Sequence, residues 1–253
     1  MQNLLSQCTS LDYKDWKGQR NDLIGQLKPQ LVKSPENDIS TFYNYLENEI
    51  KRLINSKDNG EILRCLHFCS ILYHFQRNHD IINAYFSTIS QKLNGADRPI
   101  ANAIAKTFYW FAQDSSGLYQ AFREPLTISN RIMKNHSKNY YNALILFKRI
   151  RKFLPSELIQ IILSSPQTYI DIASSDDKES QIVTLKLFEF VFSKISDIHL
   201  QSNFDIFYES SQKFLESSDD DCFYCGVRFY DFLLNIKSFK SPPPFDLIMS
   251  RAD

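Results

Sequence analysis

The stretch that decides the fold covers residues 97–155 and reads DRPIANAIAKTFYWFAQDSSGLYQAFREPLTISNRIMKNHSKNYYNALILFKRIRKFLP. Its apolar residues recur at steps of three and four, which is the spacing of one face of an α-helix. Polar breaks at residues 113–117 and 135–137 divide them into three stripes. The stripes consist of Ala101, Ile104, Ala105, Phe108 and Phe111, then Leu118, Phe122 and Leu126, then Tyr140, Leu144, Phe147 and Ile150. The stretch therefore predicts three consecutive helices joined by short turns.

The same periodicity runs through the rest of the chain. Helices are predicted over residues 12–32, 39–53, 66–72, 82–93, 158–172, 182–191, 204–214 and 227–234, with the one over 158–172 bent by Pro166. No stretch alternates apolar and polar residues between hairpin turns, so no strand is predicted. The residues expected in the core are Trp16, Leu23, Leu27 and Leu31; Ile39, Phe42, Leu46, Ile50 and Leu53; Leu66, Cys69 and Leu72; Ile82, Tyr85, Ile89 and Leu93; Leu158, Ile161, Ile162, Tyr169 and Ile172; Ile182, Val183, Leu187, Phe190 and Val191; Phe204, Phe207, Ser211 and Phe214; and Val227, Tyr230, Leu233 and Leu234.

The predicted helices recur with a period of about 40 residues, which indicates a repeat architecture. Residues that open a helix recur at Asp58, Asp97, His136, Asp176 and Asp219, with spacings of 39, 39, 40 and 43. Two apolar columns follow in this register, eleven and fourteen residues later: Cys69, Phe108, Phe147, Leu187 and Tyr230, and Leu72, Phe111, Ile150, Phe190 and Leu233. Such a period is typical of HEAT and armadillo arrays, and two helices per unit favour HEAT. The predicted fold is an all-α solenoid of about five to six HEAT/armadillo-like helical hairpins, because one hairpin cannot bury its own apolar face.

Composition limits the function classes and the compartment. The 253 residues include 29 basic and 29 acidic ones, and this balance gives no electrostatic footprint for nucleic acid or an anionic membrane. No signal peptide and no apolar run of about 18 residues is recognised, so no membrane span is expected. Five cysteines without a targeting segment predict a reducing, cytoplasmic location. Residues 1–241 are interpreted as one domain, and residues 242–253 as a Pro-rich C-terminal segment, because three prolines at 242–244 disfavour helix continuation.

No residue constellation indicates chemistry. Cys222 and Cys225 form a C-x-x-C motif, but they lie on a predicted helix without the βαβ context of a redox site. Cys65, His67 and Cys69 lie two or more repeats away, so a four-ligand zinc site is disfavoured. The histidines have no partners at catalytic spacing, and no phosphate-binding loop or kinase motif occurs. We therefore expect neither an enzyme nor a cofactor or metal site.

Three features are interpreted as structural, each with a functional alternative. The basic run Lys148, Arg149, Arg151 and Lys152 is split around Ile150, so we interpret it as a solvated face; if it binds, an acidic partner surface is as suitable as nucleic acid. Trp110 lies between two core positions and is expected to pack rather than to anchor a partner. The acidic segment 217–221 is interpreted as a helix cap rather than as a phosphorylation site.

Three blocks resemble one family, the target-of-rapamycin kinases of the PI3-kinase-related group. Residues 41–58 (TFYNYLENEIKRLINSKD), 97–108 (DRPIANAIAKTF) and 141–155 (YNALILFKRIRKFLP) resemble units of its N-terminal HEAT region, in the same order and at similar distances. The resemblance covers residues 15–195. The chain departs from the family at residues 130–133, where NRIM replaces Glu-Trp-Leu, and at Pro125 within the same helix. Nothing in the sequence resembles the kinase, FAT or rapamycin-binding regions.

The resemblance implies a non-catalytic scaffold in growth and nutrient signalling. Its expected partners are Raptor-like regulatory subunits of such kinase complexes. The chain is then either the N-terminal piece of a longer kinase or a short relative without catalysis. The alternative is an unrelated HEAT or armadillo adaptor of the transport-receptor or phosphatase-scaffold type. The sequence leaves the binding face and the oligomeric state open.

Overall fold

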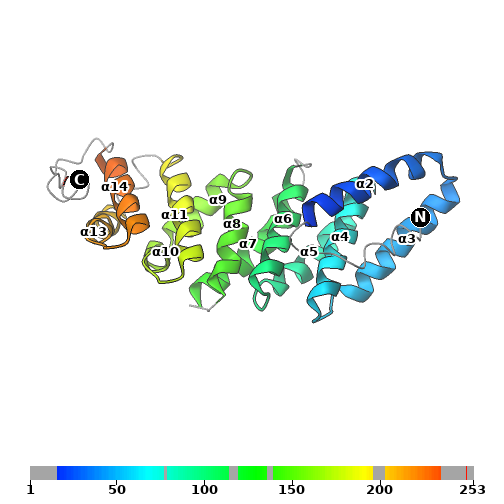
Figure 1. Ribbon diagram of the computed structural model, residues 1–253, viewed down its shortest axis with the longest axis horizontal. Coiled ribbons are helices and arrows are strands. Elements are labelled where there is room, and N and C mark those ends of the chain that lie inside the picture. The colour runs from blue at the N-terminus through cyan, green and yellow to red at the C-terminus, as the bar shows by residue number, and fades with distance from the viewer. Residues whose placement is uncertain are drawn as a thin grey trace. The chain divides into compact units, whose positions relative to one another are not determined.

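The structure is a computed structural model, and it describes residues 16–76, 79–113, 119–135, 139–195, 203–234 and 249. All regular secondary structure within these residues is helical (Figure 1). The helices are α2 (Trp16–Lys33), α3 (Glu36–Leu53), α4 (Asn59–Gln76), α5 (His79–Lys92), α6 (Arg98–Gln113), α7 (Tyr119–Lys134), α8 (Tyr140–Ile150), α9 (Pro155–Leu163), α10 (Pro166–Ala173), α11 (Lys178–Phe192), α13 (Phe204–Leu215) and α14 (Asp220–Leu234). The all-α prediction is confirmed. The helices fall into two compact units, Met1–Arg149 and Ile150–Asp253, where the sequence suggested one continuous array over residues 1–241.

In the first unit, three pairs of helices two positions apart along the chain pack together, and so do the consecutive helices α3 and α4. Helix α4 packs on α6, and α5 on α7, while α2 and α3 both pack on α4. This pairing of like with like is how stacked repeats bury a shared face. Phe108, Phe111 and Phe147 are at most 1 % exposed. The stripes that opened the sequence analysis are therefore core, except that Tyr140 is half-buried and Leu118 lies outside the described residues.

The second unit repeats the arrangement around an aromatic core. Helix α10 packs on α11 and α13, and α11 and α13 both pack on α14. The rings of Phe188, Phe192 and Phe207 surround that of Phe229, with centroids 4.7–6.1 Å from it. Gly226 lets α14 approach the end of α13, because a Cβ atom at this position would lie 2.7 Å from the backbone nitrogen of Leu215. Aromatic packing of this kind contributes about 0.5–1.5 kcal/mol per pair beyond the area buried.

The two apolar columns hold with one partial exception. All five residues of the first column and four of the second are buried, while Phe190 is half-buried beneath the Arg151 guanidinium, which lies 6.0 Å from its ring. Two residues expected in the core, Ile182 and Leu234, are exposed instead. Ile182 lies one residue before Val183, and that step of about 100° turns it from the buried stripe toward solvent. Residues that are half-buried rather than buried are Ile39, Tyr85, Ile161 and Val227; the side chains of Trp16, Ile82 and Phe204 lie outside the described residues.

The predicted single helix over residues 158–172 is wrong. The chain forms two helices there, α9 and α10, separated by Ser164 and Ser165. Pro166 occupies the first turn of α10, where a missing N–H costs nothing, instead of bending a continuous helix. The expectation of two helices per unit consequently fails between residues 139 and 173, which contain α8, α9 and α10.

Aspartate side chains cap the first turns of several helices, as the turn pattern predicts. Asp58 Oδ1 accepts the N–H of Glu61 at 2.9 Å, and Asp219 Oδ1 accepts that of Cys222 at 3.0 Å. The cap of α11 is Asp177, one residue after the predicted Asp176; its Oδ1 accepts the N–H of Ser180 at 3.5 Å. Asp97 instead uses its side chain to accept a hydrogen bond from Asn59 Nδ2, at 2.7 Å. The predicted fifth helix start, His136, lies outside the described residues.

Polar side chains fasten neighbouring repeats through main-chain carbonyls. Asn142 Nδ2 donates to the carbonyls of Leu93 and Ala96, both at 2.8 Å, and so holds the α5–α6 turn against α8. Gln181 Nε2 donates at 3.0 Å to the carbonyl of Ala173, the last residue of α10. The last carbonyls of a helix have no partner within it, so these amides satisfy groups that burial would otherwise leave without hydrogen bonds.

The cap assignment on α11 predicts a difference between two adjacent aspartates. Asp177→Ala should lower the free energy of unfolding by about 1 kcal/mol, the usual effect of losing an N-cap. Asp176→Ala is the matched control, because it removes the same charge from an exposed position that does not cap the helix. Urea unfolding of both variants and the wild type measures the difference. Equal losses would contradict the assignment.

A buried histidine predicts an acid-sensitive core. His67 on α4 is fully buried, and burial together with the Arg20 charge lowers its pKa to about 3. The unfolded chain takes up this proton near its ordinary pKa of about 6.5, while the folded chain does not until about pH 3. His67 should therefore cost nothing above pH 6.5 and destabilise progressively below it, by about 2 kcal/mol at pH 5.

Urea unfolding at several pH values tests this expectation against His67→Leu, which cannot titrate. The variant should lose stability between pH 7.5 and 5 by about 2 kcal/mol less than the wild type. Parallel pH profiles for the two proteins would exclude His67 as the source of the acid sensitivity.

Candidate protein-interaction surface

Helices α11 and α14 pack together and each leaves one stripe in solvent. The exposed stripe of α11 contains Lys178, Glu179, Ile182, Lys186, Glu189 and Ser193, and that of α14 contains Asp220, Asp221, Tyr224, Arg228, Asp231 and Leu234. The opposite faces of both helices lie in the aromatic core. Because helix periodicity fixes one face inward, the other is held in a defined position without contributing to the core. We refer to these two stripes together as the α11–α14 face.

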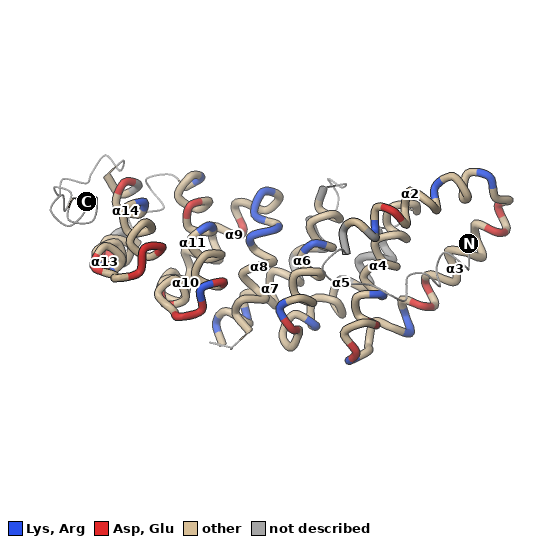
Figure 2. The backbone as a smooth tube through the Cα atoms, in the orientation of Figure 1, with Lys and Arg blue, Asp and Glu red and all other residues tan. Residues whose placement is uncertain are grey.

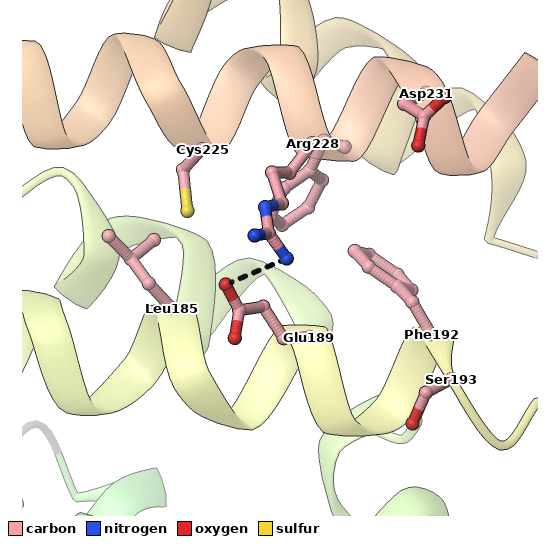
Figure 3. Close-up of a pocket in the computed structure, with 8 residues that line it drawn as sticks. Leu185, Glu189, Phe192, Ser193, Cys225, Arg228 and Asp231 are labelled. Atoms are coloured by element: carbon pink, nitrogen blue, oxygen red, sulfur yellow. Dashed lines mark ion pairs between the residues drawn. The ribbon is translucent and has the colours of Figure 1, made fainter.

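A pocket of about 190 Å³ opens on this face (Figure 3). Its apolar walls are nearly buried side chains, Leu185 and Phe192 from α11 and Cys225 and Phe229 from α14. Glu189, Ser193, Arg228 and Asp231 complete its lining and bring polar groups to it. The volume is below the roughly 300–1,000 Å³ of small-molecule sites. The pocket therefore suits one or two side chains of a protein partner.

Arg228 connects the two helices across the pocket. Its Nη1 lies 3.4 Å from Glu189 Oε1, while its Nε and Nη2 donate to the Tyr224 hydroxyl at 3.1 and 2.7 Å. The hydrogen bond to Tyr224 and then the charge of Glu189 raise the pKa of Arg228. These contacts orient Tyr224, whose side chain is large and 54 % exposed. Tyrosine and arginine are the residue types that most often carry binding energy in protein interfaces.

The charge of the chain is divided unevenly between its two units. Residues 1–149 contain 19 basic and 13 acidic residues, a net charge of +6, and residues 150–253 contain 10 and 16, a net charge of −6. In the second unit, acidic residues gather at the α10–α11 and α13–α14 turns (Figure 2). The balanced total that the composition shows thus conceals an acidic unit that carries the α11–α14 face.

Comparison with known proteins identifies the fold. No protein-family description matches the sequence, and no curated protein sequence matches it. Solved structures of engineered proteins do match. The chain has an armadillo-type helical-repeat fold. A designed armadillo repeat protein matches with a TM-score of 0.52 and 12 % identity over 91 % of this chain and 98 % of its own. An engineered protein matches with a TM-score of 0.54 and 16 % identity over 92 % of this chain and 95 % of its own. A computationally designed armadillo repeat protein for modular peptide recognition matches with a TM-score of 0.53 and 11 % identity over 91 % of this chain and 98 % of its own.

The basic run chosen from the sequence is only partly exposed on the armadillo-type array. Lys148 and Arg149 are half-buried in the last turn of α8. The residues that flank them in the sequence, Phe147 and Ile150, lie in the core. Arg151 is half-buried over Phe190, and Lys152 is exposed. Binding of an acidic partner by these four residues, the functional alternative to a solvated face, stays a prediction.

Two other sequence interpretations concern packing. Trp110 is half-buried, and the Arg20 guanidinium lies 3.6 Å from its ring centre, so α6 and α2 meet through a cation–π contact. In the acidic segment 217–221, Asp219 caps α14 and the N–H of Asp219 donates to the Ser217 hydroxyl at 3.2 Å. The hydrogen bond from Lys178 and then that from the Cys222 N–H lower the pKa of Asp219. The interpretation of this segment as a cap is confirmed.

The four cysteines among the described residues are buried and form no disulfide. Burial raises the pKa of Cys222, and burial together with the charge of Glu189 raises that of Cys225 to about 12. The Cys222 sulfur accepts a hydrogen bond from Gln181 Nε2 at 2.8 Å. Cys65 and Cys69 are buried on α4 in the other unit, where the hydrogen bond of the Cys69 thiol with Cys65, and then burial, raise the pKa of Cys69. Within the described ranges, no cluster of three or more His, Cys, Asp or Glu side chains is arranged to hold a metal ion.

Sequence reasoning did not find the α11–α14 face. Its key residues are Glu189 and Arg228, which lie 39 positions apart and meet only when consecutive repeats stack. One signal was present: Tyr224 and Arg228 are four residues apart, the spacing at which side chains on a helix contact each other.

Of the described helices, none has the length and apolar character needed to cross a membrane.

The raised thiol pKa values predict slow labelling. At pH 8, Cys222 and Cys225 should stay unmodified by a thiol-specific disulfide reagent in the folded protein, because a raised pKa lowers the thiolate fraction of each and both residues are buried. Both should react at once in denaturant, which is the internal control. Peptide mapping separates them from Cys8. Rapid labelling of Cys225 in the native chain would contradict the burial of this residue.

Proposed function

We propose that the chain is a non-catalytic scaffold that binds other proteins through the exposed faces of its stacked helices. The observation that carries this proposal is the α11–α14 face, where a rigid core holds an exposed Tyr224 and a pocket in place. Binding sites built on rigid elements need little ordering when a partner arrives. The likeness to a designed array made for modular peptide recognition supports an extended peptide segment as the partner's bound form.

The resemblance to target-of-rapamycin kinases supports a more specific proposal. On this basis the chain acts in the cytoplasm, in growth and nutrient signalling, and binds a regulatory subunit of the Raptor type. An armadillo adaptor outside that family is the second candidate, and the armadillo character of the matched solved structures favours it. The two differ in the partner that they bind: a kinase-complex regulatory subunit supports the first, and an unrelated cargo or enzyme supports the second.

Affinity capture with the full chain as bait tests the scaffold proposal. Native lysate proteins that remain bound are identified by mass spectrometry, and a specific partner should be enriched in amounts comparable to the bait. A purified chain that hydrolyses ATP or transfers phosphate would overturn the non-catalytic part of the proposal.

A truncation shows whether binding needs the stacked array. Removing residues 1–58 deletes α2 and α3 and exposes the face of α4 on which both pack. We expect partial unfolding or aggregation and weakened capture, because each repeat rests on its neighbours. Reversing the charges of Lys148, Arg149, Arg151 and Lys152 is the comparison variant, which should keep its helix content. A truncated chain that stays monomeric, fully helical and equally active in capture would refute the stacked-scaffold proposal.

A further inference from the structure

The α11–α14 face combines an apolar recess with exposed apolar residues. Five large hydrophobic side chains are exposed among the described residues, and three of them, Ile182, Tyr224 and Leu234, lie on this face. The other two are Val32, on α2 in the other unit, and Met249. Apolar groups that gather on one face beside a pocket mark an interaction site more reliably than scattered ones.

The charged residues on the same face indicate the net charge that a suitable partner carries. Its exposed charged residues are five acidic ones against three basic ones: Glu179, Glu189, Asp220, Asp221 and Asp231, and Lys178, Lys186 and Arg228. Two of these cations already contact carboxylates within the face or beside it, Arg228 with Glu189 and Lys178 with Asp219. Glu189 and Asp231 both line the pocket. The whole unit carries a net charge of −6, so the local excess is reinforced at longer range.

The lining and volume of the pocket indicate which side chain of a partner fits into it. Its walls are Leu185, Phe192 and Phe229, three apolar side chains that are at most 7 % exposed. A volume of about 190 Å³ suits one or two side chains, and an aliphatic one matches the apolar walls. Glu189, its partner Arg228 and Asp231 line the pocket beside these walls, two carboxylates against one cation, so a chain that enters with an apolar residue would place its flanking residues next to a net negative charge (Figure 3). Basic flanking residues complement that arrangement, whereas acidic ones are repelled.

We propose that the α11–α14 face binds a basic peptide segment of a partner protein, with one aliphatic side chain in the pocket and lysine or arginine residues along the two helices. This inference rests on the proposed scaffold function and names its site and its ligand chemistry. Tyr224, whose hydroxyl accepts hydrogen bonds from the pocket residue Arg228, offers an exposed ring beside this site to the peptide backbone or its aliphatic stems. The binding energy is concentrated in the pocket, and the acidic residues provide the orientation and the rate of association.

Fluorescence anisotropy with synthetic peptides and the full chain tests the proposal. The probe is a labelled nine-residue peptide in which lysines alternate with serines around a central leucine. One matched peptide has glutamates in place of the lysines, and another has glycine in place of the leucine. The lysine–leucine peptide should bind at least about tenfold more tightly than either, and its affinity should fall between about 50 and 300 mM salt, where screening increases.

Variants of the face locate the binding. Glu189→Lys combined with Asp231→Lys should weaken the lysine–leucine peptide by about tenfold or more. Glu209→Lys combined with Glu216→Lys is the matched control: it makes the same change of charge at two exposed positions in the same unit, on α13 and at its end. This control should change the affinity by less than about twofold, because neither residue lines the pocket.

A third variant separates shape from charge. Ser193 is exposed at the end of α11 and lines the pocket, so Ser193→Trp should fill its entrance without disturbing the core. It should abolish the preference for leucine over glycine and leave the salt dependence in place. Circular dichroism and urea unfolding of every variant confirm that its fold is retained, since all the substituted residues are exposed.

The possible results separate this inference from the scaffold function. Equal affinity for the glutamate peptide, or equal weakening by the two charge-reversal pairs, would overturn the α11–α14 site. Absence of peptide binding while the full chain still captures a partner would also overturn it and leave the scaffold proposal standing. Dimerisation of the wild-type chain that the Glu189 and Asp231 variant abolishes would assign the face to a second copy of the chain, and so would reject the peptide.

Discussion

A helical hairpin has an apolar face that it cannot bury alone, and the whole molecule depends on this constraint. Each unit solves the problem by packing like helices on each other, α4 on α6 in the first and α11 on α14 in the second. The columns that include Phe108, Phe147 and Leu187 are the residues that this stacking removes from water. Because the packing consumes only one stripe of each helix, the opposite stripe is held rigidly and stays available for contact with a partner.

Short helices create a second requirement, because each end leaves main-chain groups without helical partners. The chain meets it with side chains whose types suit the task. Asp58, Asp177 and Asp219 accept N–H groups at helix starts, and Asn142 and Gln181 donate to carbonyls at helix ends or in the turns that follow. The amide contacts also cross from one repeat to the next. They therefore fix the register of stacking, which apolar contacts alone define only loosely.

The sequence predicted features that depend on local pattern and missed those that depend on contacts between repeats. Apolar columns follow from residue type and spacing, so Phe108 and Phe147 could be placed in the core with no structure. The break at Ser164 could not, because Pro166 is compatible both with a bend and with the start of a new helix. The pocket residues Glu189 and Arg228 are unremarkable charges on separate helices, and only stacking brings them together.

Charge shows the same dependence on three-dimensional arrangement. A neutral total excludes an electrostatic footprint only if positive and negative residues are mixed along the chain, and here they are not: one unit carries +6 and the other −6. The neutral total of the chain therefore does not describe the surface of the second unit, whose own net charge is −6. In the proposed complex, the pocket at Glu189 sets the affinity, and the surrounding carboxylates set the charge of the ligand.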